Sequence, residues 1–461
     1  MSFSLILWTI VKIAIMVGFV VNGAAILTWF DRRGGGLMQD RPGPNRAVVK
    51  IFGKEFRLAG LLHPAADGLK FFTKEDYMPP KADKLLFSLA PILALAPVIA
   101  LVAVIPFGDT VCPNDLWRSI HGSVVFPWVP RYGVCGAGMT ETGPVFPINL
   151  MVANLNVGIL FVFALAGQGI IGAGIAGWSS DNKFSLMGAL RAASQMVSYE
   201  VAMGLSLIGA MMVYGSLQLD EMVRWQGDNA WGIFVQPVAF FLFFTAAVAE
   251  TKRIPFDLPE AESELVSGYF TEYSGMKFGM FYFAEYMEVV TSSMLIVTIF
   301  LGGWELPFLH RDGLTIEFGK LTLLHASIPH IWMTIIGVVG FFGKVAVMCI
   351  LQAFIRWSLP RFRYDQLMKL GWRVLLPLSL ANVLVTGVVI LALQAGGASV
   401  SDALDVAADI TQAIIALAIT YGLVRLVLNF FKPRTRKLSI AGSGAKYAAE
   451  TGGTPVTPMQ A

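Results

Sequence analysis

The sequence has few of the residues that hold redox centres. Its 3 cysteines and 5 histidines are scattered over 461 residues, a distribution that suits neither an iron–sulfur cluster nor a haem. It also has no phosphate-binding loop and no dinucleotide fingerprint. The sequence therefore predicts no metal site and no bound nicotinamide, and any electrons in a redox reaction must come from another polypeptide.

Charged residues are scarce as well. They make up 14% of the chain against 56% hydrophobic residues, and the net charge is only +3 with a mean hydropathy of +0.65, so a nucleic-acid partner is not indicated. Apolar runs of about 20 residues, each able to cross a bilayer as a helix, recur along the chain. We predict an all-α, polytopic membrane protein with eight core transmembrane helices and a ninth near the carboxyl end. The predicted spans are residues 3–30, 85–107, 150–178, 190–214, 232–249, 278–302, 331–357, 374–393 and 403–431.

Lysines and arginines are distributed unevenly between the two sides of this predicted bundle. Of the 34, 26 fall in the loop of residues 31–84, in every second loop after it, and in the carboxyl tail. Because positive charge accumulates in cytoplasmic loops, we expect these segments to face the cytoplasm and the amino terminus to be periplasmic. The first apolar run lacks a signal-peptide cleavage site, so it is expected to remain as the first helix of a protein in the inner (plasma) membrane.

Residues 250–273, ETKRIPFDLPEAESELVSGYFTEY, form what we call the acidic loop. Carboxylates clustered beside a bilayer are costly to ionise, so some are expected to hold protons at neutral pH. A solvated inter-helix loop is the alternative, but Pro255 and Pro259 beside the apolar Phe256 and Leu258 favour a turn packed on protein. The six carboxylates of the loop are Glu250, Asp257, Glu260, Glu262, Glu264 and Glu272.

Charged residues inside the predicted spans are further candidates, because a carboxylate within a membrane is costly and is usually functional. Glu200 lies near the middle of the fourth span, and Glu285 and Glu288 are three residues apart in the sixth. The alternative is that one of these glutamates forms a purely structural ion pair with Lys344 of the seventh span.

Three cytoplasmic segments have distinctive compositions. In DRRGGGLMQDRPGPNRAVV, residues 31–49, the glycines and prolines are expected to prevent a helix. The segment HPAADGLKFFTKE is expected to form an amphipathic helix in the membrane interface with Leu69 and Phe72 on its apolar face. A generic surface helix without a ligand explains the same pattern. The basic segment RWSLPRFRYDQLMKLGW suits either a lipid-facing belt or a positive counterpart of the acidic loop.

Two further regions complete the chain. Residues 108–147 form a long outer loop that contains Cys112 and Cys135, which we predict to form a disulfide if the compartment is oxidising. After the ninth span, residues 432–461 are basic and then rich in Gly, Ala and Thr, and are expected to be a disordered cytoplasmic tail.

Several of these motifs together resemble the H-subunit family of NADH:quinone oxidoreductase, respiratory complex I, whose mitochondrial counterpart is NADH dehydrogenase subunit one. The resemblance covers residues 1–395 in order. Residues 108–147 and the ninth span exceed the mitochondrial core. The motifs that carry it are RR-GGGLMQDRPGPN, HPAADGLKFFTKE, GWSSDNKFSLMGALRAASQMVSYEV, ETKRIPFDLPEAESELVSGYFTEY and LPRFRYDQLMKLGW.

The resemblance implies a membrane subunit that contacts the peripheral redox subunits and the rest of the membrane arm. With the former it would build a chamber for quinone, its substrate, while NADH, FMN and the iron–sulfur clusters lie in partner subunits. The residues implied to line the chamber are Arg32, Asp67, Lys70, Phe71, Arg361 and Arg363. The residues implied to relay protons are Asp257, Glu260, Glu262, Glu264 and Glu272, with Glu200 and Glu285 deeper in the membrane.

The chain departs from the family pattern at two positions. It has Asp31 where the family usually has Glu, and His63 where the family usually has Gln, which leaves the fine geometry of the chamber open. Two other interpretations remain at this point. One is a docking scaffold whose charges are structural, and the other is the membrane subunit of an energy-converting hydrogenase without a quinone.

Overall fold

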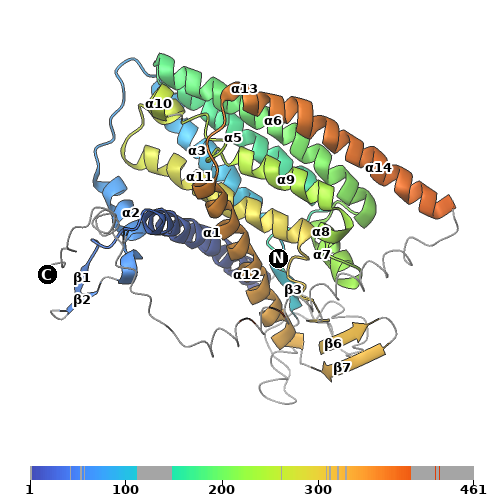
Figure 1. Ribbon diagram of the computed structural model, residues 1–461. Coiled ribbons are helices and arrows are strands. Elements are labelled where there is room, and N and C mark those ends of the chain that lie inside the picture. The colour runs from blue at the N-terminus through green and yellow to red at the C-terminus, as the bar shows by residue number, and fades with distance from the viewer. Residues whose placement is uncertain are drawn as a thin grey trace, which may run out of the picture. The chain divides into compact units, whose positions relative to one another are not determined.

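The computed structural model is mostly helical (Figure 1). It describes residues 3–41, 43–51, 54–56, 58–111, 148–260, 262–307, 309–310, 313–318, 321–327 and 330–395, together with Tyr421 and Arg425. The chain divides into two units, Met1–Gln412 and Ala413–Ala461. Most of the predicted 108–147 loop, both its cysteines, the ninth span and the tail lie outside the described residues, apart from Tyr421 and Arg425.

Seven helices of the described part are long and apolar enough to cross a membrane, which confirms the prediction of a polytopic helical membrane protein. Each overlaps a predicted span. They are α1 (Phe3–Met38), α3 (Lys84–Leu101), α5 (Gly158–Ser179), α6 (Lys183–Tyr214), α11 (Gly275–Phe300), α12 (His330–Ser358) and a continuous run of α13 (Tyr364–Lys369), the π-helical turn η4 (Leu370–Leu375) and α14 (Leu376–Ala395).

The fifth predicted span is broken. It consists of the short helix α8 (Gly232–Val235) and of α9 (Pro237–Glu250), which has 14 residues and a length of about 21 Å, less than a bilayer core. Gln236 leaves the helical conformation just before Pro237, which cannot donate a backbone hydrogen bond. The side chain of Gln236 donates to Thr386 of α14 over 3.1 Å, so a neighbouring helix supports the break.

The expectation that glycines prevent a helix after residue 31 is wrong. Helix α1 continues through Gly34, Gly35 and Gly36 to Met38. A Cβ atom at Gly34 would lie 1.9 Å from the ring of Trp357 on α12. The glycine therefore permits a close approach of two helices, and this packing outweighs its low helix propensity.

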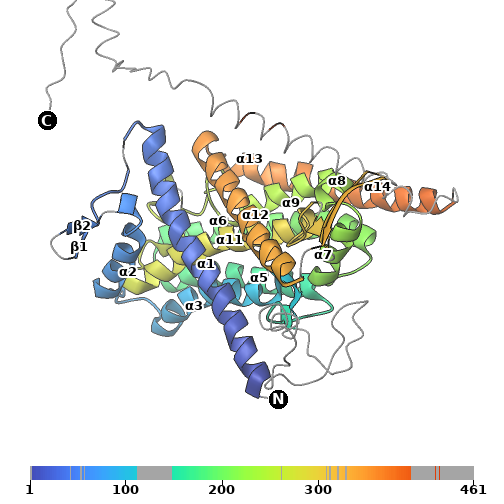
Figure 2. The same ribbon diagram turned by 90° about the horizontal axis from the view of Figure 1, so that it is seen from below.

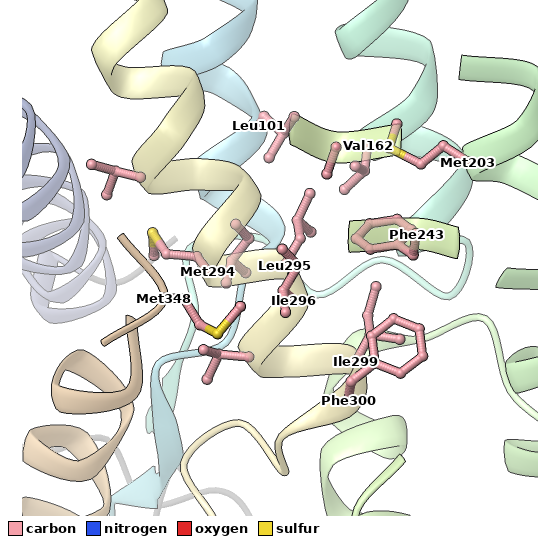
Figure 3. Packing of buried hydrophobic residues seen from close by; sticks show 14 of the residues in the cluster. Leu101, Val162, Met203, Phe243, Met294, Leu295, Ile296, Ile299, Phe300 and Met348 are labelled. Carbon is pink, nitrogen blue, oxygen red and sulfur yellow. The ribbon is translucent and has the colours of Figure 1, made fainter. Parts of the chain in front are cut away.

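Helix α11 lies at the centre of the bundle and contacts α1, α3, α9 and α12. Figure 3 shows Met294 and Phe300 of α11 among side chains that include Leu101 of α3, Phe243 of α9 and Met348 of α12. In lipid, apolar helices gain little from hydrophobic burial, so close packing of this kind holds them together. The central position of α11 places Glu285 and Glu288, which lie near the middle of this helix, inside the bundle.

Helix α12 lies against α1 (Figure 2), where the ring centres of Phe19 and Phe342 are 4.0 Å apart. The amphipathic helix α2 (His63–Thr73) forms as predicted and packs on α1 and α11. Its Leu69 and Phe72 are about 70% exposed, as expected for side chains that face lipid.

Short strands were not predicted. One hairpin lies between α1 and α2, and the others lie at the opposite end of α11 from the acidic loop. The strands are β1 (Val49–Ile51), β2 (Lys54–Phe56), β3 (Gly108–Val111), β4 (Ile148–Leu150), β5 (Leu309–His310), β6 (Gly313–Phe318) and β7 (Leu321–Ser327), paired β1–β2, β3–β4 and β5–β6–β7, all antiparallel.

Candidate functional site

The acidic loop is a structured turn packed on protein, as its prolines predicted. Phe256 and Leu258 are buried. The amide side chain of Gln195 on α6 donates to the carbonyl oxygens of Ala249 and Phe256, both over 2.8 Å. The backbone N–H of Phe362, in the basic segment after α12, donates to Pro255 over 3.0 Å. The helix α10 (Glu262–Leu265) and the turn η3 (Gly268–Phe270) follow within the loop.

The two cations of the loop point to different carboxylates. Arg253 donates to Asp31 of α1 over 3.1 Å, and Arg356 of α12 donates to the same oxygen. The Arg253 guanidinium also lies 3.4 Å from the ring centre of Tyr286 on α11. Asp31 is buried, and a buried carboxylate requires partners of this kind. One ion-paired cluster therefore joins α1, the acidic loop, α11 and α12.

The second cation of the loop, Lys252, contacts Glu288 and not Asp31. Its Nζ lies 3.3 Å from both carboxylate oxygens of Glu288 on α11, and the side chain is 5% exposed. Burial opposes the charge of Lys252, but the carboxylates of Glu288 and Glu285 outweigh that effect and raise the pKa of the ammonium group above its usual value.

Glu260 of the acidic loop lies close to Glu285 of α11. Tyr269 donates a hydrogen bond to Glu285 over 3.0 Å. Burial, with the nearby carboxyls of Glu285 and Asp257, raises the pKa of Glu260 to about 9. Burial also raises the pKa of Tyr269 well above its usual value, so its hydroxyl remains a donor. At neutral pH the pair therefore holds a proton.

Two more carboxylates extend this group into the bundle. Glu250 and Glu288 line the same cavity of about 50 Å³ between α3, α5, α6, α9 and α11. Glu250 also lies within electrostatic reach of Glu200, whose carboxylate faces Gly167 of α5. We call Glu260, Glu285, Glu288, Glu250 and Glu200 the carboxylate row.

The structure does not bring all predicted relay residues into this row. Glu264 is an exposed residue that pairs with Arg191 over 2.7 Å, and the hydrogen bond and charge of Arg191 lower its pKa. Glu272 accepts a hydrogen bond from Asn182 over 2.6 Å. Asp257 lies close enough to Glu260 to influence it. The backbone of Glu262 is helical, and its side chain lies outside the described residues.

An apolar pocket of about 220 Å³ lies between α1, α2, α3 and α11. Asp67 and Phe71 of α2 line it, as does Tyr282 of α11. Arg32 donates to Asp67 over 2.5 Å and lies near Tyr282. Three of the six predicted chamber residues are therefore gathered at this pocket. The lining residues are Ala25, Thr28, Pro64, Asp67, Gly68, Phe71, Phe72, Leu95, Met276, Gly279, Met280, Tyr282 and Phe283.

The other three predicted chamber residues lie elsewhere. Lys70 is exposed on α2 and does not line this pocket. Arg361 and Arg363 lie within electrostatic reach of Glu264. This arrangement supports the interpretation of the basic segment as a positive counterpart of the acidic loop.

The sequence did not assign roles to several residues that the structure places at these sites. Lys252 and Arg253 were visible only as offsetting charges, and Arg356 only as part of a basic segment. Aromatic residues of a membrane helix carry no signal that separates Tyr282 or Tyr286 from a packing residue. The site residues that were missed are Asp31, Lys252, Arg253, Tyr269, Tyr282, Tyr286 and Arg356.

Comparison with known proteins identifies the family. A family model described as NADH dehydrogenase matches residues 11–387. The chain is 42% identical over 381 residues to an H subunit of NADH-quinone oxidoreductase from Geobacter sulfurreducens, and the match covers 83% of this chain and 94% of the relative. The chain belongs to the H-subunit family of NADH-quinone oxidoreductase.

Other members of the H-subunit family show the extent of the similarity. An H subunit from Cytophaga hutchinsonii is 40% identical over 364 residues, 79% of this chain and 91% of the relative. The H subunit from Dehalococcoides mccartyi is 38% identical over 434 residues, 94% of this chain and 98% of the relative, so this similarity extends past residue 387. As a member of the family, the chain is a multi-pass membrane subunit of complex I, and other subunits of that complex are its partners.

Proposed function

We propose that this subunit builds the membrane side of a quinone chamber and couples quinone reduction to ion translocation through the carboxylate row. The observation that carries the proposal is a series of contacts from the apolar pocket to the acidic loop. Tyr282 lines the pocket, and its hydroxyl donates to that of Tyr286 over 3.2 Å. The ring of Tyr286 faces Arg253, next to Lys252 in the loop.

The pocket has the chemistry that an amphipathic, isoprenoid-tailed quinone requires. Its lining is mainly apolar, and the ion pair of Arg32 and Asp67 supplies polar groups at one side. Because α2 presents Leu69 and Phe72 outward, a substrate dissolved in lipid reaches the pocket beside this helix. The acidic loop, the pocket and the carboxyl tail are assigned to the cytoplasmic side and the amino terminus to the periplasm, on the distribution of lysine and arginine.

The coupling rests on electrostatics. Reduction of a quinone to a quinol takes two electrons, supplied by a partner subunit's iron–sulfur cluster, and two protons. Negative charge that develops in a region of low dielectric changes the protonation of nearby carboxyls, and a shift of one pKa unit corresponds to about 1.4 kcal/mol. The Glu260–Glu285 pair has a proton to give, and Glu288, Glu250 and Glu200 offer sites for carrying the change into the bundle.

A photoreactive quinone tests the chamber. It should label peptides of α2 and α11, and excess quinone should suppress the labelling. The substitution Gly68→Leu fills the pocket at a position where a Cβ meets nothing within 4 Å, so it should raise the KM for quinone. Ala66→Leu, on the exposed face of α2, is the matched control. Labelling confined to other regions, with an unchanged KM in Gly68→Leu, would contradict the chamber.

The docking-scaffold alternative makes a different prediction. If the charges only hold subunits together, neutralising Glu260 lowers the amount of assembled complex but leaves turnover per complex unchanged. The relatives from Geobacter, Cytophaga and Dehalococcoides are components of NADH-quinone oxidoreductases, which favours the quinone enzyme over the hydrogenase alternative.

A further inference from the structure

Lys252 occupies a strained and buried position for a charged residue. Its backbone φ is +56°, a left-handed conformation that is unfavourable for a residue with a Cβ atom and tends to mark functional sites. The next residue, Arg253, points to Asp31. The left-handed turn therefore aims two consecutive cations in different directions, one at the chamber side and one at the carboxylate row.

The ammonium group of Lys252 interacts with three members of the carboxylate row. It contacts both oxygens of Glu288 at 3.3 Å. It also lies within electrostatic reach of Glu285 and Glu250. Glu285 belongs to the proton-holding Glu260–Glu285 pair, and Glu288 and Glu250 both line the same cavity.

We propose that Lys252 is the positioning residue of the carboxylate row: its ammonium group holds the carboxylate of Glu288 in place as the acceptor for a proton that leaves the Glu260–Glu285 pair. This inference rests on the proposed function. Without Lys252, the carboxylate of Glu288 would lose the ion pair that fixes its position in the bundle.

The transfer balances without a co-reactant. An O–H bond breaks at Glu285, an O–H bond forms at Glu288, and no electron moves. Once Glu288 is neutral it attracts Lys252 less, and the ammonium is drawn to the newly ionised Glu285. That change of partner opposes return of the proton. The cavity of about 50 Å³ beyond Glu288 has room for water, through which the proton continues to Glu250.

The test uses the purified complex reconstituted in liposomes and measures protons translocated per NADH oxidised. A positioned proton-transfer group contributes roughly 10²-fold or more to its step, so Lys252→Met should slow coupled turnover at least about tenfold and lower the proton ratio. Lys252→Arg retains the charge and should recover most of both. The double variant Lys252→Met with Glu288→Gln removes both charges and should remain uncoupled.

A purely structural ion pair gives the opposite result. The double variant, which leaves no buried charge unpaired, would then regain turnover and the full proton ratio, and the proposal would be wrong. The matched control is Lys277→Met, which breaks the pair with Asp76 at 2.9 Å and should keep the ratio. An equal loss in this control would also overturn the proposal. If Glu260→Gln uncouples the enzyme while Lys252→Met does not, only the role of Lys252 fails, whereas normal coupling in Glu260→Gln contradicts the proposed function itself.

Discussion

The carboxyl group of Glu260 in the acidic loop lies close to that of Glu285 on α11, and burial together with this neighbour raises the pKa of Glu260. Two carboxylates this close repel each other when both are ionised, so the pair holds a proton at neutral pH. Tyr269 donates a hydrogen bond to Glu285 over 3.0 Å. The chain thus stores a proton where the loop meets α11, the most buried of the long helices in the described part of the chain.

The stored proton should be visible in the infrared spectrum. Burial and neighbouring carboxyls raise the pKa of Glu260 from 4.5 to about 9. Between pH 4.5 and about 9 the folded chain binds more protons than the unfolded chain. The contribution of Glu260 to the free energy of unfolding therefore falls as the pH rises through this range. We expect a protonated carboxyl band that persists at neutral pH, disappears as the pH passes about 9, and is absent from Glu260→Gln. Loss of the band already in mildly acidic solution would contradict this assignment.

Glu264 should behave differently from Glu260, although both belong to the acidic loop. Its side chain is 61% exposed and pairs with Arg191 at the surface. Surface pairs of this kind contribute about 0–1 kcal/mol. We therefore expect Glu264→Gln to assemble normally and to retain quinone reductase activity and proton translocation close to those of the unmodified enzyme. Loss of proton translocation in this variant as severe as in Glu260→Gln would place Glu264 in the relay after all.

Asp31 should be essential for stability. It holds Arg253 and Arg356 together, and removing one partner of a buried ion pair costs about 3–5 kcal/mol. We expect Asp31→Asn to lower the thermal stability and the yield of assembled complex. Asp31→Glu keeps the charge and should be milder. If both variants had the stability of the unmodified chain, the cluster would not join the helices as described.

Two consecutive glycines of α1, Gly34 and Gly35, provide a matched pair of substitutions. A Cβ atom at Gly34 meets Trp357 at 1.9 Å, whereas one at Gly35 meets nothing within 4 Å. The ring of Trp357 packs against Phe30 and Phe354, so it has little room to move away from an added Cβ atom. Gly34→Ala should lower the melting temperature of the complex, and Gly35→Ala should leave it unchanged or raise stability by about 0.5–1 kcal/mol. Equal effects of the two would contradict the packing.

Hydrophobicity alone was sufficient to locate the seven long apolar helices. A run of apolar residues long enough to span a bilayer usually forms a transmembrane helix. Hydrophobicity did not show that Gln236 breaks the fifth span, since that break depends on side-chain partners supplied by α14. The glycine-rich composition also gave the wrong conclusion at Gly34, where a contact with a residue far along the chain decides the conformation.

Within the acidic loop, the sequence showed that carboxylates are concentrated but did not show which of them are buried together. Glu264 and Glu260 look equivalent in composition, yet one faces Arg191 at the surface and the other faces Glu285. Lys252 and Arg253 are adjacent cations that contact different carboxylates, Glu288 and Asp31, and the backbone of Lys252 is left-handed. These differences depend on backbone direction, which local composition does not encode.

The most direct test of the account is the number of protons translocated per NADH oxidised by the reconstituted complex that carries Glu285→Gln. If the carboxylate row couples quinone reduction to ion movement, the assembled variant should bind quinone, with both the turnover and the proton ratio reduced. An assembled variant with full turnover and the full proton ratio would contradict the central claim.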